Sequence, residues 1–371
     1  MTKKKVAIYL HIPFCVQKCY YCDFLSAPAE ERIKTLYVEA LLRECEYWKE
    51  RISDYEVTSL FVGGGTPTSL SVGQLQTLQK AVMSLYQPDK TRHVEFTVEM
   101  NPGTVDADKL SVLKEMGVNR VSVGLQSADD AELQRLGRIH SFADFLRTVD
   151  LLHKASLTNF NVDIMAALPG QNIASYRRTL QAVTAVSPAH ISAYSLILEP
   201  NTALFVNKVK PISEDLDYKM YKYIEKKFTK KGYHHYEVSN YSIPGYESVH
   251  NLNYWDNNEY YGFGLGAHGF ISELRYENTR SFNTYLKDNF RFNELVLSKR
   301  EDMENEIILG FRKLDGIDIV EFFNKYHTNI QDEFNITPLL KNGLLVLKDN
   351  MMFIRKDKVY VMNTILNEIL K

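Results

Sequence analysis

The chain has few cysteines, no long apolar run and almost no net charge. Its 4 cysteines among 371 residues are too few for a disulfide-stabilised scaffold. No apolar stretch approaches the roughly 18 residues that a membrane helix requires, so we expect no membrane span. The 44 Lys and Arg nearly balance the 46 Asp and Glu, so no overall basic field favours nucleic acid. The basic N-terminus lacks a signal-peptide pattern, and we expect a cytoplasmic location.

Three of the four cysteines are crowded into the run HIPFCVQKCYYCDF. Cys15, Cys19 and Cys22 have the spacing C-x3-C-x2-C, which is typical of metal ligands on one short loop. Three thiolates would hold three corners of a [4Fe-4S] cube and leave the fourth iron open for the amino and carboxylate groups of S-adenosylmethionine (SAM). The alternative is a zinc knuckle short of one ligand, with His11 as the nearest candidate. Cys45 stands alone on an amphipathic stretch, which indicates core packing.

Short branched or aromatic runs alternate with helical patterns as far as residue 200. This alternation predicts six βα units, and six strands favour a partial (β/α)6 barrel over a closed eight-stranded one. Strands are expected at residues 6–11, 59–62, 94–99, 120–124, 160–165 and 190–195. Helices are expected at residues 30–51, 72–86, 107–116, 142–155 and 175–186. Polar or glycine-rich motifs fall at the carboxyl ends of these strands, where parallel barrels carry their chemistry.

The βα alternation fades after residue 200. The tyrosine-rich stretch 218–261 is expected to form an irregular cap with short strands, and the C-terminal part a winged-helix-like α+β appendage. The expected domains are therefore 1–200, 201–298 and 299–371. The last lacks a basic recognition helix, which favours partner contact over DNA binding. Its expected elements are helices at 303–313, 319–326 and 340–345 and strands at 352–354 and 358–361.

A glycine run and several polar residues at strand ends are candidate SAM contacts. The run GGGTPT begins at Gly63 after an apolar strand, and glycine there lets the backbone approach a ligand closely. A plain glycine-rich turn is the alternative, and the Lys of a phosphate-binding loop is missing. Glu99, Gln126, Arg138 and Asp163 are placed to contact the ribose hydroxyls and the methionine carboxylate. For each taken singly, a solvated or structural role is the alternative.

Together these motifs resemble the radical SAM family of oxygen-independent coproporphyrinogen III oxidase and its relatives, over essentially the whole chain. The matching motifs are Tyr9-Leu-His11-Ile-Pro13-Phe14-Cys15, Cys19-Tyr-Tyr21-Cys22, GGGTPT, Glu99-Met-Asn-Pro102, Gln126, Arg138, Asp163 and LPGQ. The resemblance is closest to the HemW branch of heme chaperones. The oxidase has a further cysteine where this chain has Phe24, and a long extension before the first cluster ligand, here Cys15. The HNxxYW motif of HemW-like proteins appears at His250–Trp255.

The resemblance implies cofactors, partners and site residues. Cys15, Cys19 and Cys22 would hold the [4Fe-4S] cluster. The residues implied to contact SAM are Tyr9, Tyr21, Gly64, Gly65, Thr66, Glu99, Gln126, Arg138 and Asp163. The implied function is a chaperone that binds heme and transfers it to an acceptor protein, served by a flavodoxin- or ferredoxin-like electron donor. The alternative is an oxidase that decarboxylates coproporphyrinogen III with SAM, so enzymatic turnover stays open.

His250 is the candidate heme ligand. Imidazole is a common axial ligand of heme iron, and the aromatic rings of Tyr254 and Trp255 suit a porphyrin face. The alternative is a structural histidine whose hydrogen bonds are satisfied within the protein. His268, in GLGAHGF, is a second candidate. His234 and His235, flanked by tyrosines in an expected strand, are weaker ones.

Overall fold

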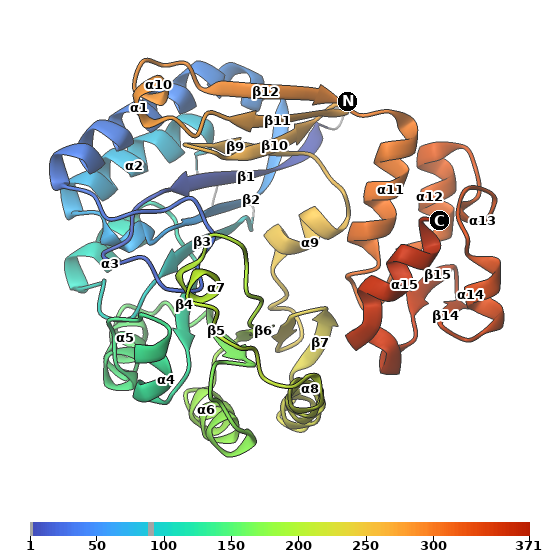
Figure 1. The fold of residues 1–371 in the computed structure, drawn as a ribbon. Coiled ribbons are helices and arrows are strands. Elements are labelled where there is room, and N and C mark those ends of the chain that lie inside the picture. Colours follow the sequence, from blue (N-terminus) through green and yellow to red (C-terminus); the bar gives the residue numbers. More distant parts are fainter. Residues whose placement is uncertain (1–2, 88–92) are drawn as a thin grey trace.

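The computed structural model describes residues 3–87 and 93–371, which form a large lobe and a smaller C-terminal lobe (Figure 1). Six parallel strands form the centre of the large lobe: β1 (Lys4–Ile12), β2 (Tyr55–Gly64), β3 (Glu95–Met100), β4 (Arg120–Gln126), β5 (Phe160–Ala166) and β6 (His190–Ser195). The segments between them form α1 (Glu31–Ser53), η1 (Pro67–Ser69), α2 (Val72–Leu85), α3 (Ala107–Glu115), α4 (Asp130–Arg135), α5 (Phe142–Lys154) and α6 (Ile173–Ala185). The helices lie outside the curved sheet (Figure 1). The expected partial (β/α)6 barrel is confirmed.

Local sequence signals explain these elements. Strand β4 is buried along its whole length, as a parallel strand covered on both faces must be. Helix α2 begins with a capping box between Ser71 and Gln74, and α5 with one between Ser141 and Asp144. These caps satisfy backbone N–H groups that a helix start otherwise leaves free, so each helix begins close to the predicted position.

Residues 201–298 extend the same sheet at both edges. They form α7 (Ala203–Val206), α8 (Glu214–Thr229), β7 (His234–Glu237), β8 (Asn240–Ser242), α9 (Val249–Trp255), β9 (Tyr260–Phe263), β10 (His268–Ile271), β11 (Leu274–Asn278), α10 (Phe282–Tyr285) and β12 (Arg291–Val296). β8 pairs antiparallel with β6, and β9 pairs parallel with β1. The twelve strands follow the order β12-β11-β10-β9-β1-β2-β3-β4-β5-β6-β8-β7. The domain boundary expected at residue 200 stays a prediction.

The expected irregular cap is wrong at its start, because residues 218–229 lie in helix α8. Ser213 caps this helix by accepting a hydrogen bond from the Leu216 N–H. Met220, Ile224 and Phe228 follow at four-residue spacing and are buried on one face. The many tyrosines concealed this helical period in the sequence.

The C-terminal lobe has its own hydrophobic core and a three-stranded antiparallel sheet in the order β13-β15-β14. Its elements are α11 (Lys299–Gly310), β13 (Ile317–Asp318), α12 (Ile319–Tyr326), α13 (Ile330–Glu333), α14 (Thr337–Lys341), β14 (Leu345–Lys348), β15 (Met351–Ile354), η2 (Lys356–Val361) and α15 (Met362–Ile369). The expected α+β appendage is confirmed. The strand expected at 358–361 is wrong, because burial of Val359 in a 3-10 turn overrides the β preference of its side chain. The helix expected at 340–345 ends at Lys341, and Leu345 already pairs with Ile354.

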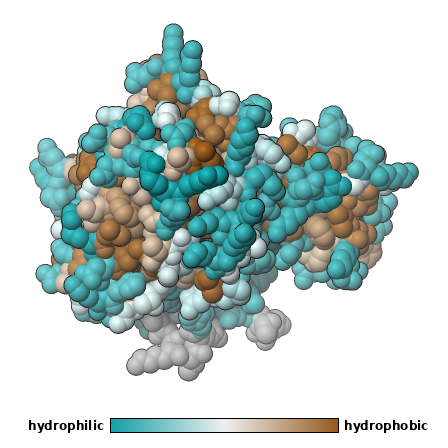
Figure 2. Space-filling model, turned by 90° about the horizontal axis from the view of Figure 1, so that it is seen from below, coloured by the Kyte–Doolittle hydropathy of each residue, from teal (hydrophilic) through white to brown (hydrophobic). Residues whose placement is uncertain are grey.

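The two lobes meet at helix α9, which contacts β2 in the large lobe and α11 in the small one. Figure 2 shows a narrow junction between the lobes and hydrophobic side chains in separate patches on a mostly hydrophilic surface. Among the helices of residues 3–87 and 93–371, none combines the length and the apolar character that crossing a bilayer demands.

Candidate functional site

The three clustered cysteines lie on the loop that follows β1. All three are free thiols at partly exposed positions, and they line one cavity of about 130 Å³. The Cys22 N–H donates to the Cys19 carbonyl at 3.2 Å, which closes a tight turn between these two ligands. Cys45 is fully buried in the core of the large lobe, away from this cavity. The chain therefore presents three thiols to the cavity and keeps the fourth apart.

The glycine run after β2 holds the cysteine loop in place. The Gly65 N–H donates to the Ile12 carbonyl at 2.8 Å, and the Thr66 N–H to the Phe14 carbonyl at 2.6 Å. A Cβ atom at Gly65 would lie 2.5 Å from the Phe14 carbonyl oxygen, closer than any side chain tolerates. Glycine is thus needed here for close approach of two backbones, and this approach positions Cys15.

A chain of hydrogen bonds connects two of the cysteine sulfurs. The Thr66 hydroxyl lies 3.6 Å from the Cys15 sulfur and accepts from the Asn101 amide at 2.7 Å. Arg138 donates to the Asn101 side-chain oxygen at 2.7 Å and to the Cys19 sulfur at 3.4 Å. This role of Asn101 was not predicted from the sequence, although the residue lies within the motif Glu99-Met-Asn-Pro102. The signal that could have identified this residue was a polar side chain just past the end of a predicted strand.

Two carboxylates face the same cavity from β3 and β5. The Gly64 N–H donates to Glu99 at 3.0 Å, while Ser122 and Asn161 donate to Asp163 at 3.1 and 2.7 Å. Desolvation, and then the negative charge of Asp163, raise the pKa of Glu99 to about 7. Desolvation also raises the pKa of Asp163. Burial therefore disfavours the charged form of both carboxyl groups, and a cationic ligand in the cavity would favour it.

Gln126 reaches the cavity through an irregularity in β4. Its backbone adopts φ of 70°, a left-handed conformation that is uncommon outside glycine, and the pairing with β5 shifts between Gly124 and Gln126. Such bulges re-aim a side chain and occur beside functional sites. Here the re-aimed side chain is Gln126, which lines the cavity.

The fold brings most of the predicted SAM contacts together. Those that line the cavity of the three cysteines are Tyr21, Gly64, Gly65, Glu99, Gln126, Arg138 and Asp163. Thr66 lies behind the cavity against Cys15, and Tyr9 faces a different cavity. Contact with SAM stays a prediction for all nine residues.

The residues present fit a [4Fe-4S] cluster with SAM. Across the described part of the chain, no three His, Cys, Asp or Glu side chains converge as ligands of a single metal ion. Three separated thiols on one cavity instead suit the corners of a larger cluster. A second cavity of about 470 Å³ adjoins the first, shares Glu99, Gln126 and Asp163 with it, and continues to Tyr194. The two together offer polar space beside the thiols for a nucleoside-sized ligand.

His250 lies in helix α9 with both ring nitrogens engaged. Its exposed fraction is 1%, its Nδ1 lies 2.9 Å from the Ser59 hydroxyl, and its Nε2 lies 2.9 Å from the Tyr254 hydroxyl. The Phe61 ring stacks on the imidazole with centroids 5.0 Å apart. Burial, and then the charge of Arg120, lowers the pKa of His250 to about 3. A role of His250 in heme binding stays a prediction.

A larger cavity of about 720 Å³ lies beside the cysteine loop, between strands β9–β11 and helix α11. Its aromatic lining comprises Tyr9, Phe24, Tyr254, Trp255 and Tyr260. Its charged lining comprises Lys18, Asp23, Arg275 and Arg280. His268, the second histidine candidate, also lines it. The weaker candidates lie elsewhere: His234 is exposed near Glu247, and the buried His235 ring stacks on Tyr241 at 4.2 Å.

Comparison with known proteins agrees with this geometry. The radical SAM superfamily profile matches residues 9–183, and the HemN C-terminal domain profile matches residues 297–352. The heme chaperone HemW of Lactococcus lactis is 38% identical over 355 residues, which cover 93% of this chain and 92% of that protein. HemW of Bacillus subtilis is 32% identical, with 93% and 94% covered. HemW of Escherichia coli is 35% identical, with 85% of each covered.

A solved structure shares the architecture of both lobes. The coproporphyrinogen III oxidase HemN from Escherichia coli, a radical SAM enzyme, superposes with a TM-score of 0.85. It covers 99% of this chain and 90% of its own, at 20% sequence identity, so this likeness shows the fold alone. With the high identity to several HemW proteins over nearly their whole length, the chain belongs to the HemW family of heme chaperones within the radical SAM superfamily.

Proposed function

We propose that this protein is a heme chaperone that binds heme and passes it to an acceptor protein. The cavity of about 720 Å³ beside the cysteine loop carries this proposal. Its volume lies within the roughly 300–1,000 Å³ of small-molecule sites, and aromatic rings with basic side chains suit a flat apolar macrocycle bearing carboxylates. Curated relatives of similar length are named as heme chaperones, which supports the same function.

Membership of the radical SAM superfamily implies a [4Fe-4S] cluster and SAM as cofactors. We assign the cluster to Cys15, Cys19 and Cys22. When bound, the cluster supplies one electron for reductive cleavage of SAM. Arg138 donates to the Cys19 sulfur at 3.4 Å and so holds this side chain in place at the proposed cluster site. Glu99 offers a negative charge to the cationic groups of SAM once it has lost its proton.

The proposed cycle needs two protein partners. A flavodoxin- or ferredoxin-like donor would deliver the electron, and an acceptor protein would take the heme. We place the cycle in the cytoplasm, as the composition of the chain predicts. The oxidase alternative is less well supported, because Phe24 stands where the oxidase has a further cysteine and the likeness to HemN extends to fold only.

Heme titration and a turnover assay test the proposal together. The protein is reconstituted anaerobically with iron and sulfide, titrated with heme and followed by difference absorption. Heme-loaded protein is then mixed with apomyoglobin as a general heme acceptor. In parallel, carbon dioxide release from coproporphyrinogen III is measured with SAM and a reductant. We expect stoichiometric heme binding, transfer to apomyoglobin and no carbon dioxide; decarboxylation without heme binding would establish the oxidase instead.

A further inference from the structure

Strands β10 and β11 present several side chains to the large cavity from one face of the sheet. His268 is paired directly with Glu277, and Phe270 with both Arg275 and Tyr260. Directly opposed residues in an antiparallel pair point to the same side of the sheet. His268, Arg275 and Tyr260 all line the large cavity, so this face is the one turned toward it.

His268 is the imidazole of this cavity that remains free. The other lining imidazole, His11, has its Nδ1 2.9 Å from the Tyr9 hydroxyl and its Nε2 2.9 Å from the Leu25 carbonyl. The imidazole ring of His268 makes no hydrogen bond with any residue in 3–87 or 93–371, and 56% of its side chain is exposed. Its Nε2 lies 3.8 Å from a Glu277 oxygen. Metal-binding histidines commonly turn one ring nitrogen to a carboxylate, which leaves the other for the metal.

The other side chains of the cavity that could bind heme iron are less suitable. Heme iron also accepts tyrosinate, but burial raises the pKa of both Tyr254 and Tyr260 above the ordinary tyrosine value. The Tyr254 hydroxyl is in addition hydrogen-bonded to His250. The Lys18 ammonium donates to the Phe24 carbonyl at 2.8 Å. His268 therefore needs the least rearrangement to bind iron.

The cavity also offers an unpaired cation. Among its charged groups, Arg280 is held by Glu277 at 2.7 Å, and Lys18 by the carbonyl of Phe24. The side chain of Arg275 forms neither a hydrogen bond nor an ion pair with the described residues, and its buried Nε lacks a partner. Its guanidinium carbon lies 5.2 Å from the centre of the Phe270 ring, which holds it on the same face as His268. A free guanidinium beside a free imidazole matches the two functions of heme, a carboxylate and an iron.

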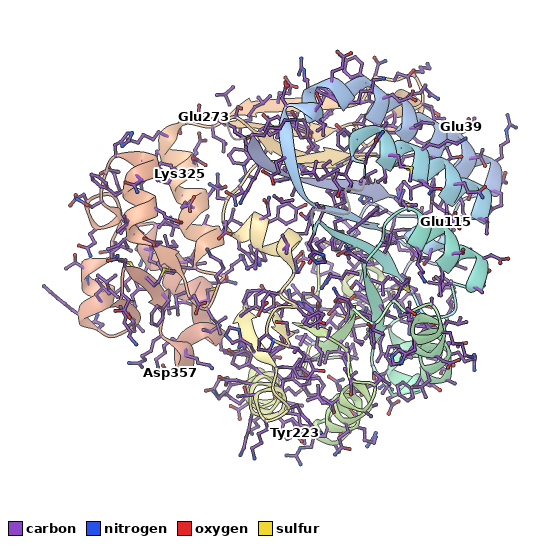
Figure 3. The ribbon with its side chains drawn as sticks, turned by 180° about the vertical axis from the view of Figure 1, so that it is seen from behind. Glu39, Glu115, Tyr223, Glu273, Lys325 and Asp357 are labelled. Carbon is purple, nitrogen blue, oxygen red and sulfur yellow. The ribbon has the colours of Figure 1, made fainter. Side chains whose placement is uncertain are left out.

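The hairpin that carries these residues adjoins the second lobe. It turns at Glu273, whose position where the sheet meets the C-terminal lobe is labelled in Figure 3. The Leu297 N–H donates to the Glu273 carbonyl at 2.9 Å, just before α11 begins. Leu309 of α11 lines the cavity from the other side. The cavity thus lies between the barrel and the small lobe.

We propose that His268 binds the heme iron and that Arg275 binds a heme propionate in this cavity. The inference rests on the proposed heme-chaperone function and adds to it the residues that hold the cargo. In this arrangement His250 supports the cavity from behind, through its hydrogen bond to Tyr254, without touching the iron.

Heme titration of three variants tests this assignment. His268→Ala is compared with His234→Ala, a matched control that is 51% exposed and has Glu247 at 3.9 Å. For His268→Ala we expect roughly ten- to hundredfold weaker heme binding and a changed Soret band, both restored by added imidazole. Arg275→Leu should weaken binding about tenfold and leave the Soret position unchanged, because it removes a propionate contact only. His234→Ala should behave as the wild type.

The outcomes separate the two proposals. If the wild type binds heme and His268→Ala binds it with the same affinity and spectrum, the assignment of His268 is wrong while the chaperone function stands. If Arg275→Leu binds heme as tightly as the wild type, the propionate assignment is wrong. If the wild type binds no heme at all, the proposed function fails and this inference fails with it.

Discussion

The small cysteine cavity and the large cavity differ in how their polar groups are held. At the small one, Thr66, Asn101 and Arg138 form a chain of hydrogen bonds that ends at the sulfurs of Cys15 and Cys19. In the large one, the side chains of His268 and Arg275 lack hydrogen-bond partners among the residues described. A site whose groups are held in advance suits a resident cofactor, because little ordering remains to be done on binding. A site with unpaired groups is completed by its ligand, which suits a cargo that must also leave.

Removing one cluster ligand should have the largest effect. Cys19→Ala leaves two thiols for the cluster, so we expect reconstituted protein to lose nearly all iron, sulfide and visible absorption. Heme affinity of the large cavity should change less than about twofold, because the lost thiol does not line it. Cys45→Ala is the matched control and should keep the full cluster. Full cluster content in Cys19→Ala would contradict the ligand assignment.

The two histidines should differ strongly in stability. His250→Ala leaves the hydroxyls of Ser59 and Tyr254 without their partner and opens a void beside Phe61. We expect the free energy of unfolding to fall by about 2–4 kcal/mol, against less than about 0.5 kcal/mol for His268→Ala. Urea unfolding of the cluster-free protein measures both values. Equal losses of unfolding free energy in the two variants would show that burial does not distinguish these two residues.

The small cavity should make stability depend on pH. The pKa of Glu99 is about 7 in the folded protein against about 4.5 ordinarily, so the folded state holds a proton that the unfolded state releases. The free energy of unfolding should therefore fall as pH rises from about 4.5 to 7. Glu99→Gln should remove this loss and be more stable than the wild type at pH 8 by on the order of 2 kcal/mol. The control is Glu39→Gln, on the outer surface of α1 (Figure 3).

One outcome would contradict the predicted effect of Glu99 on the pH dependence of stability. If wild type and Glu99→Gln lose stability in parallel between pH 4.5 and 8, Glu99 is ionised in the folded protein over the whole range. Denaturant unfolding at four or five pH values is sufficient, with the cluster-free protein used throughout so that metal binding does not contribute.

The smallest expected effect concerns the connecting amide of the small cavity. Asn101→Ala breaks the hydrogen bonds that join Thr66 to Arg138, so both side chains gain freedom that SAM binding must remove. We expect SAM affinity to fall about tenfold and heme affinity to stay the same. Asn258→Ala, in the lining of the large cavity, should leave SAM affinity unchanged. Calorimetric titration with SAM measures the SAM affinity of both variants. An equal loss of SAM affinity in the two would refute a specific role for Asn101.

Local sequence patterns were sufficient to predict much of the fold. The six central strands and most helices lie within a few residues of their predicted positions, because apolar period and caps act over short stretches. The errors occur where packing overrides local preference, as in the 3-10 turn around Val359 and in helix α8, whose tyrosines hid its buried face. The pairing of β9 with β1 was equally beyond reach, because the neighbours of strands that are distant in the sequence are decided by the packing of the whole sheet.

By itself, the sequence determined the ligand set of the small cavity: Cys15, Cys19 and Cys22 share one short loop, so their spacing alone brings them together. It also determined the succession of βα units that gathers Glu99 and Asp163 at one end of the barrel. Only the tertiary structure decided which histidine is free. The Ser59 hydroxyl that engages His250 lies 191 positions away, whereas no such long-range partner reaches His268 among the residues described. Whether a side chain is satisfied depends on contacts between distant segments, and no local pattern records them.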